Sequence, residues 1–92
     1  MSESIRQRVV VSGLVQGVGF RYWTVQEATR IGVSGDVTNR ADGTVLAHVE
    51  GAADDVDRLV NWFRAGGAPS ARVDSVEVTD EPPVGASSFD IV

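Results

Sequence analysis

SGLVQGVGFRYW (residues 12–23) decides the fold, because it joins a valine-rich segment to a segment of helical character through a loop of small residues. Residues 6–14 are rich in Val and end after a glycine, which predicts a buried β-strand. From Arg21 to Ile31 there is no Gly or Pro, and Gly32 stands where a helix C-cap is expected. The stretch therefore predicts a strand, a glycine loop and a helix, in that order.

Beyond this unit, the sequence pattern predicts a hairpin, a second helix and two further strands. An Asp-Gly pair in RADG (residues 40–43) suits the turn of a β-hairpin. The expected elements are strands at residues 33–39 and 44–50, a helix within residues 51–67, a strand at residues 71–80 and a short final strand at residues 89–92. The order βαββαβ predicts an α+β, ferredoxin-like sandwich with a mostly antiparallel sheet and two helices on one face. We expect residues 1–92 to form one domain.

The composition excludes several kinds of chemistry. The eight basic residues are all Arg, so that the chain offers neither a P-loop lysine nor a Schiff-base amine. The absence of Cys excludes disulfides, zinc–thiolate sites and a thiol nucleophile, and it suits the reducing cytoplasm. A net charge of −5 disfavours nonspecific binding to nucleic acid or to an anionic membrane. No segment approaches the length of about 20 apolar residues that spans a bilayer, so we expect a soluble cytoplasmic protein.

The glycine loop and the arginine after it suggest an anion site. Gly17 and Gly19 can adopt positive φ, which lets backbone N–H groups converge at the positive end of a helix. Arg21 could contact two phosphoryl oxygens at once through its planar guanidinium. The alternative is a tight turn followed by a solvated arginine. A dinucleotide-binding loop is disfavoured because Tyr22 occupies the place of the third glycine.

Two motifs, GLVQGVGFR (residues 13–21) and GDVTNRADGTV (residues 35–45), resemble in order and spacing those of the acylphosphatase family. The final FDIV (residues 89–92) also fits, so the resemblance covers nearly the whole chain. It implies hydrolysis of the carboxyl–phosphate bond of small acyl phosphates by direct attack of water on phosphorus. It also implies that the reaction needs no metal or other cofactor, and that inorganic phosphate binds as product or inhibitor.

The resemblance assigns roles to particular residues. Arg21 matches the family's catalytic arginine, and Asn39 matches its water-positioning asparagine. From the residues alone, Asn39 could instead serve only to open the turn that follows it. The loop expected to bind the phosphoryl group through backbone amides and Arg21 consists of Val15, Gln16, Gly17, Val18, Gly19, Phe20 and Arg21. The chain departs from the family at Asp36, where an aromatic residue is common, and at Ala41, where Pro is common.

Other conspicuous residues are expected to serve the fold. His48, the only histidine, falls on the strand face opposite Val45, Ala47 and Val49, which should face the core. The remaining residues of this kind are the acids Asp54, Asp55 and Asp57, expected to cap a helix, and the aromatics Trp23, Trp62 and Phe63, expected to pack. We therefore expect no metal site and no nucleic-acid surface.

Two other functions remain open. A non-catalytic module could bind a phosphate-bearing metabolite through the same loop, since the fold alone does not decide function. An interaction domain could pair its edge strand at residues 89–92 with a partner. Because one small core can fold without a second chain, we expect a monomer.

Overall fold

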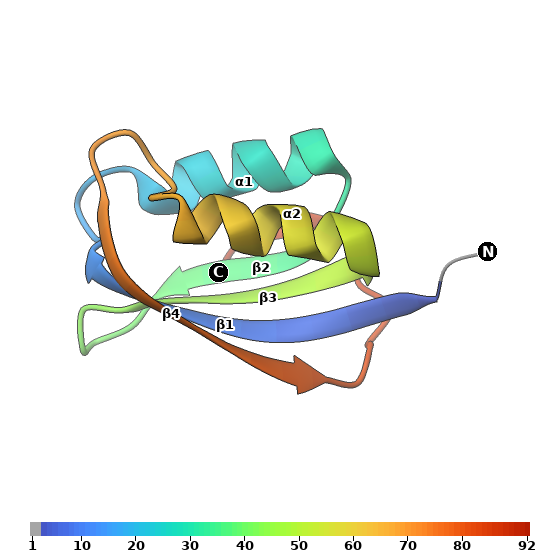
Figure 1. Cartoon of the computed structure of the whole chain (residues 1–92). Helices are drawn as coiled ribbons and strands as arrows, with labels where there is room; N and C mark the ends of the chain where they lie inside the picture. The colour runs from blue at the N-terminus through green and yellow to red at the C-terminus, as the bar shows by residue number, and fades with distance from the viewer. Residues whose placement is uncertain (1–2) are drawn as a thin grey trace.

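The computed structural model describes residues 3–92, so Met1 and Ser2, the first residues of the expected domain, lie outside it. Figure 1 shows two helices side by side on one face of a sheet. The strand order is β4-β1-β3-β2-β5, and each neighbouring pair is antiparallel except β2 and β5. The elements are β1 (Ser4–Leu14), α1 (Phe20–Ile31), β2 (Ser34–Asn39), β3 (Val45–Ala52), α2 (Ala53–Arg64), β4 (Arg72–Glu81) and β5 (Phe89–Ile91). The predicted α+β, ferredoxin-like sandwich is confirmed.

The core fills the space between the helices and the sheet, as the period-2 and helical patterns predict. Val45, Ala47 and Val49 of β3 are fully buried, which confirms the predicted inward face of this strand. They pack with residues of β1, β2 and the inner sides of both helices. The buried contributions of α2 are Val56, Leu59, Val60 and Phe63. The same packing holds α1 against β2, β5 and α2.

The aromatic residues of the helices mostly pack, as predicted. Phe63 is fully buried and stacks on Phe20, with ring centroids 5.8 Å apart. Trp62 is half-buried, and its ring centroid lies 5.9 Å from that of Phe20 and 5.5 Å from that of Phe63. Trp23 is more exposed, at 43%. Phe20 therefore fastens the beginning of α1 to the end of α2.

The predicted capping of α2 by acidic side chains is wrong. The N-cap residue is Ala52, and no side chain of the described residues caps this end. Asp54 and Asp55 lie in the first turn, where their charge suits the helix dipole without a capping hydrogen bond. Asp55 instead forms an ion pair with Arg58 one turn later.

The open face of the sheet carries a network of charges around Glu50. This residue lies on the predicted outward face of β3, yet it is only 4% exposed because the loop after β4 covers it. Its carboxylate accepts hydrogen bonds from the backbone N–H groups of Val84, Gly85 and Ala86 and from Arg6. These bonds, that of Val84 foremost, hold the pKa of Glu50 below its usual value. Glu50 thus anchors the segment that leads into β5.

His48 lies on the same open face, as predicted. Its Nδ1 is 3.2 Å from Oε2 of Glu81, and its side chain is 23% exposed. Asp36 is its cross-strand neighbour on β2. Strand alternation places both residues on the side of the sheet away from the helices.

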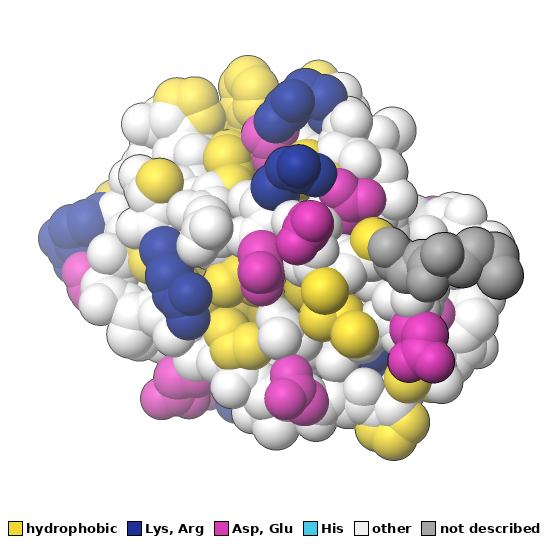
Figure 2. Space-filling model, turned by 45° about the vertical axis from the view of Figure 1, so that its right-hand side comes forward, with side chains coloured by type: hydrophobic (Ala, Val, Ile, Leu, Met, Phe, Trp, Pro, Cys, Tyr) yellow, Lys and Arg dark blue, Asp and Glu magenta, His cyan; other side chains and the backbone are white. Residues whose placement is uncertain are grey.

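The surface shows charges of both signs. On the face drawn in Figure 2, acidic and basic side chains are interspersed rather than gathered into one basic area. Within residues 3–92, no group of three His, Asp or Glu residues is arranged to hold a metal ion. No helix of the same range is long and apolar enough to cross a bilayer.

Candidate active site

The loop between β1 and α1 has the backbone conformation that its glycines predict. Gly17 and Gly19 both have φ of 75°, and Gly19 is the left-handed N-cap residue of α1. A side chain at either position would strain the backbone, even though a Cβ at Gly17 would meet nothing within 4 Å. The requirement for glycine here is therefore conformational.

The backbone N–H groups of this loop are available to a ligand. Within the described chain, no backbone N–H from Gln16 to Gly19 donates a hydrogen bond. The first helical bond of α1 runs from Trp23 N–H to Gly19 O at 3.0 Å, so the N–H groups of the preceding turn have no partner in the helix. A run of free donors at the positive end of a helix is a favourable environment for a phosphoryl group.

Arg21 lies in this first turn and lines a pocket formed by the loop. Its guanidinium has no acidic partner among residues 3–92. By contrast, Arg6, Arg40 and Arg72 are each paired with a carboxylate. Arg21 is therefore free to bind an anion in the pocket without breaking an internal ion pair.

Asn39 ends β2 at the same end of the sheet and also lines this pocket. Among the described residues, its Oδ1 is the only buried side-chain polar atom without a hydrogen-bond partner in the protein. Buried polar atoms are nearly always paired, because leaving one unpaired costs about 1–3 kcal/mol. An acceptor held in this state beside a free arginine is suited to a ligand or to a water molecule that donates to it.

The turn after Asn39 is held by its own hydrogen bonds. Arg40 N–H donates to Thr44 O at 2.9 Å, and Gly43 N–H donates to Arg40 O at 3.1 Å. The Thr44 hydroxyl and N–H both donate to Asp42, and the hydroxyl bond foremost lowers the pKa of that carboxyl. These bonds stabilise the turn without a proline at position 41, which is Ala41.

The pocket brings the loop and Asn39 together in a volume of about 180 Å³. Figure 1 shows the loop and the end of β2 at the same end of the molecule, at the left of the view. The lining residues are Val15, Gly17, Gly19, Phe20, Arg21 and Tyr22 from the loop and α1, with Asn39 from β2 and Ile91 from β5. The two proposed catalytic side chains therefore face one cavity.

Two residues of the predicted loop do not line the pocket. Val18 is partly buried against the core. The side chain of Gln16 turns away and donates from Nε2 to Arg40 O at 2.8 Å and to Thr44 O at 2.9 Å. Gln16 thus ties the loop to the turn that follows Asn39. From the sequence, Gln16 was expected to contribute only its backbone N–H, because nothing in the sequence shows that a side-chain amide reaches carbonyls 24 and 28 residues away.

Gln16→Met is expected to lower kcat by about 10- to 100-fold, because a small displacement of Asn39 relative to the loop misplaces the reacting groups. The inhibition constant of phosphate should change less, since the loop that holds it keeps its own conformation. Loss of both hydrogen bonds should also cost about 1–2 kcal/mol of stability. Steady-state kinetics and urea unfolding measure these effects. The matched control is Gln26→Met on the exposed side of α1; equal losses of kcat in the two variants would contradict the role of Gln16.

Tyr22 and Ile91 line the pocket but were not predicted to do so. Tyr22 could have been considered because it directly follows Arg21, whereas the position of Ile91 depends on how β5 pairs with β2. Asp36, at which the chain departs from the family motif, is not among the lining residues and belongs to the open face of the sheet.

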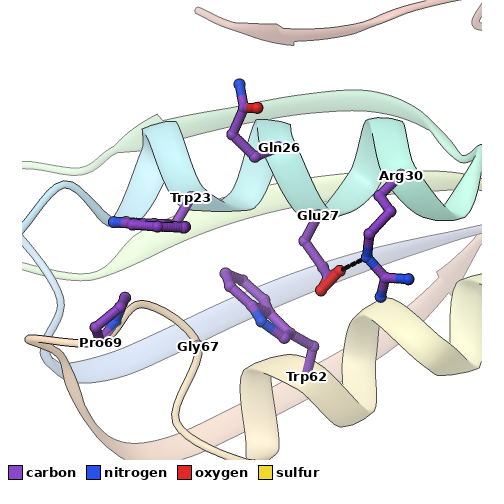
Figure 3. A pocket seen from close by; sticks show the side chains of 7 residues that line it. All are labelled: Trp23, Gln26, Glu27, Arg30, Trp62, Gly67 and Pro69. Atoms are coloured by element: carbon purple, nitrogen blue, oxygen red, sulfur yellow. Dashed lines mark hydrogen bonds and ion pairs between the residues drawn. The ribbon is translucent and has the colours of Figure 1, made fainter.

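A larger cavity of about 570 Å³ lies elsewhere, in the groove between α1 and α2. Figure 3 shows the rings of Trp23 and Trp62 on its two sides, with Glu27 directed at Arg30. The two charges compensate each other, and the hydrogen bond that Arg30 donates to the Glu27 carboxylate raises the pKa of Arg30. The smaller pocket is the better candidate site despite its size, because it contains the free N–H groups, the unpaired arginine and the unpaired amide oxygen.

Comparison with known proteins identifies the family of the chain. The acylphosphatase family model matches residues 7–91. An acylphosphatase of Rhizorhabdus wittichii is 47% identical over 87 residues, which cover 95% of this chain and 87% of that protein. One of Anaeromyxobacter dehalogenans is 51% identical over 85 residues, covering 92% and 90% of the two chains.

A solved structure of an acylphosphatase has the same fold as this chain. The crystal structure of acylphosphatase from Bacillus subtilis superposes with a TM-score of 0.90 and 36% identity, covering 96% of this chain and 98% of that one. The residues matched by the family model include the glycine loop, Asn39 and Ile91. The chain belongs to the acylphosphatase family, the hydrolases of acyl phosphates.

Proposed function

We propose that this acylphosphatase binds the phosphoryl group of its substrate with Arg21 and the backbone amides of residues 15–21, and that Asn39 orients the attacking water. One observation carries the proposal: an unpaired guanidinium, free loop N–H groups and the orphaned Oδ1 of Asn39 share one small pocket. The donors suit the phosphoryl oxygens, and the acceptor suits a water proton.

The reaction requires little from the protein beyond positioning of the reactants and stabilisation of the charge on the phosphoryl oxygens. Water forms a bond to phosphorus while the bond from phosphorus to the acyl oxygen breaks, and its electron pair leaves with the carboxylate. A carboxylate is a good leaving group, so a loose phosphoryl transition state is stabilised chiefly by positioning and by donors to its oxygens. Asn39 Oδ1 accepts one water hydrogen and so directs a lone pair at phosphorus, without first removing a proton. The water proton passes to the phosphate product or to solvent.

The reaction proposed here needs no metal ion, no cofactor and no phosphoenzyme. We also propose that the enzyme works as a single-domain monomer in the cytoplasm, as its cysteine-free composition suggests. A non-catalytic phosphate-binding module is the competing function. It is disfavoured by Asn39, because binding phosphate requires donors, whereas Oδ1 is an acceptor.

Hydrolysis of benzoyl phosphate with and without EDTA tests this proposal. We expect turnover that releases equal amounts of benzoate and phosphate and that is unchanged by the chelator. Turnover lost on adding EDTA and restored by a divalent cation would contradict the metal-free mechanism. A folded wild-type protein that binds phosphate in calorimetry but does not hydrolyse the substrate would instead favour the binding module.

A further inference from the structure

The catalytic pocket is too small to enclose much more than the phosphoryl end of an acyl phosphate. Its volume of about 180 Å³ lies below the roughly 300–1,000 Å³ of pockets that enclose drug-sized ligands. Arg21, the loop amides and Asn39 occupy its polar part. An acyl group bonded to a phosphoryl group held there must therefore leave the pocket and meet the side chains at its mouth.

Two side chains of the lining present large apolar surfaces to solvent. Tyr22 is 57% exposed and Ile91 is 49% exposed. The other large apolar residues of the lining, Val15 and Phe20, are at most 2% exposed, so their side chains belong to the core. No carboxylate lines the pocket. The accessible side chains beyond the phosphoryl site are thus a phenol ring and a branched aliphatic chain.

Neighbouring structure positions both residues: the ring of Tyr22 through an aromatic contact and Ile91 through its backbone. The ring of Tyr22 packs edge-on against Trp23, with centroids 5.7 Å apart and planes at 82°. Ile91 is positioned by the parallel pairing of β5 with β2, in which it stands opposite Val37, and Val92 N–H donates to Val37 O at 3.0 Å. Side chains that are fixed before binding lose little conformational entropy when a ligand contacts them.

We propose that Tyr22 and Ile91 form a subsite for the acyl group, and that this subsite favours aromatic acyl phosphates over short aliphatic ones. The inference rests on the proposed function, because it requires the phosphoryl group to lie against Arg21. A flat ring can contact the exposed face of Tyr22 and the methyl groups of Ile91 at once, whereas an acetyl group presents a single methyl.

The test compares kcat/KM for benzoyl phosphate and acetyl phosphate in the wild type, Tyr22→Ala, Ile91→Ala and Tyr22→Phe. The two substrates differ in intrinsic reactivity, but that difference cancels when the ratio of their kcat/KM values in a variant is divided by the wild-type ratio. We expect Tyr22→Ala to lower this ratio by about 5- to 30-fold and Ile91→Ala by about 3- to 10-fold, mainly by raising KM for benzoyl phosphate. Tyr22→Phe should keep the wild-type ratio.

Leu14→Ala is the matched control, because Leu14 is 51% exposed and does not line the pocket. Its ratio should equal that of the wild type. Equal losses on both substrates in Tyr22→Ala and Ile91→Ala would overturn the subsite while leaving the proposed function intact. A wild-type protein that hydrolyses neither substrate would instead overturn the proposed function, and the subsite with it.

Discussion

Arg21→Ala is expected to lower kcat/KM for benzoyl phosphate by at least about 100- to 1,000-fold, the usual cost of removing one preorganised transition-state donor. The loss should be larger than for a neutral donor, because a full positive charge facing the phosphoryl oxygens disappears with it. Phosphate inhibition should weaken as well, since the same guanidinium would bind the product. Arg21 has no internal ion pair to lose among the described residues, so the folded state should remain as stable as the wild type.

Two further variants make this result specific. Arg21→Lys keeps the charge but loses the planar pair of donors, so it should recover only part of the activity. Arg58→Ala removes one positive charge from the exposed side of α2, where its partner is Asp55, and should leave kcat/KM unchanged. Wild-type rates in a folded Arg21→Ala protein, with circular dichroism as the check on folding, would show that the arginine has no part in catalysis.

The sequence predicts the elements of this fold well where local pattern and burial agree. Val45, Ala47 and Val49 alternate along one strand, and all three are fully buried. Gly32 was expected to end the first helix, and it does so with φ of 98°. Such features depend on residues within one turn or one strand pair, so the information needed to predict them lies close together in the chain.

Contacts between distant segments could not be predicted in this way. Glu50 reads as an outward-facing strand residue, but a loop more than 30 residues later folds over it and supplies three N–H donors. Ile91 reaches the pocket only because β5 pairs in parallel beside β2. The glycine loop, Arg21 and Asn39 were identified as candidates because family motifs carry them, whereas the residues alone favoured a solvated arginine and a turn-opening asparagine. Tyr22, Ile91 and the side chain of Gln16 needed the structure.

Asn39→Ala is expected to lower kcat by about 100- to 1,000-fold, with little change in the inhibition constant of inorganic phosphate. Its Oδ1 is proposed to act on the attacking water rather than on the phosphoryl group, so binding of phosphate should survive its removal. Stability distinguishes this role from a structural one. Oδ1 is buried without a partner, so loss of the carboxamide should leave the free energy of unfolding unchanged or raise it by up to about 1 kcal/mol.

A turn-opening role predicts the reverse outcome: lower stability, and activity that changes only as far as the protein unfolds. Asn61→Ala is the matched control, because Asn61 is exposed on α2 and the hydrogen bond that its backbone carbonyl accepts from Ala65 N–H is kept in the variant. Steady-state kinetics, phosphate inhibition and urea unfolding on the three proteins separate the two roles. A loss of phosphate affinity as large as the loss of kcat would contradict the assignment to water, since it would mean that Asn39 holds the phosphoryl group itself. The expected result is a folded and stable variant that still binds phosphate but no longer hydrolyses the substrate. This result supports a water-orienting role for Asn39, because the loop and Arg21, which are proposed to bind the phosphoryl group, are unchanged in the variant.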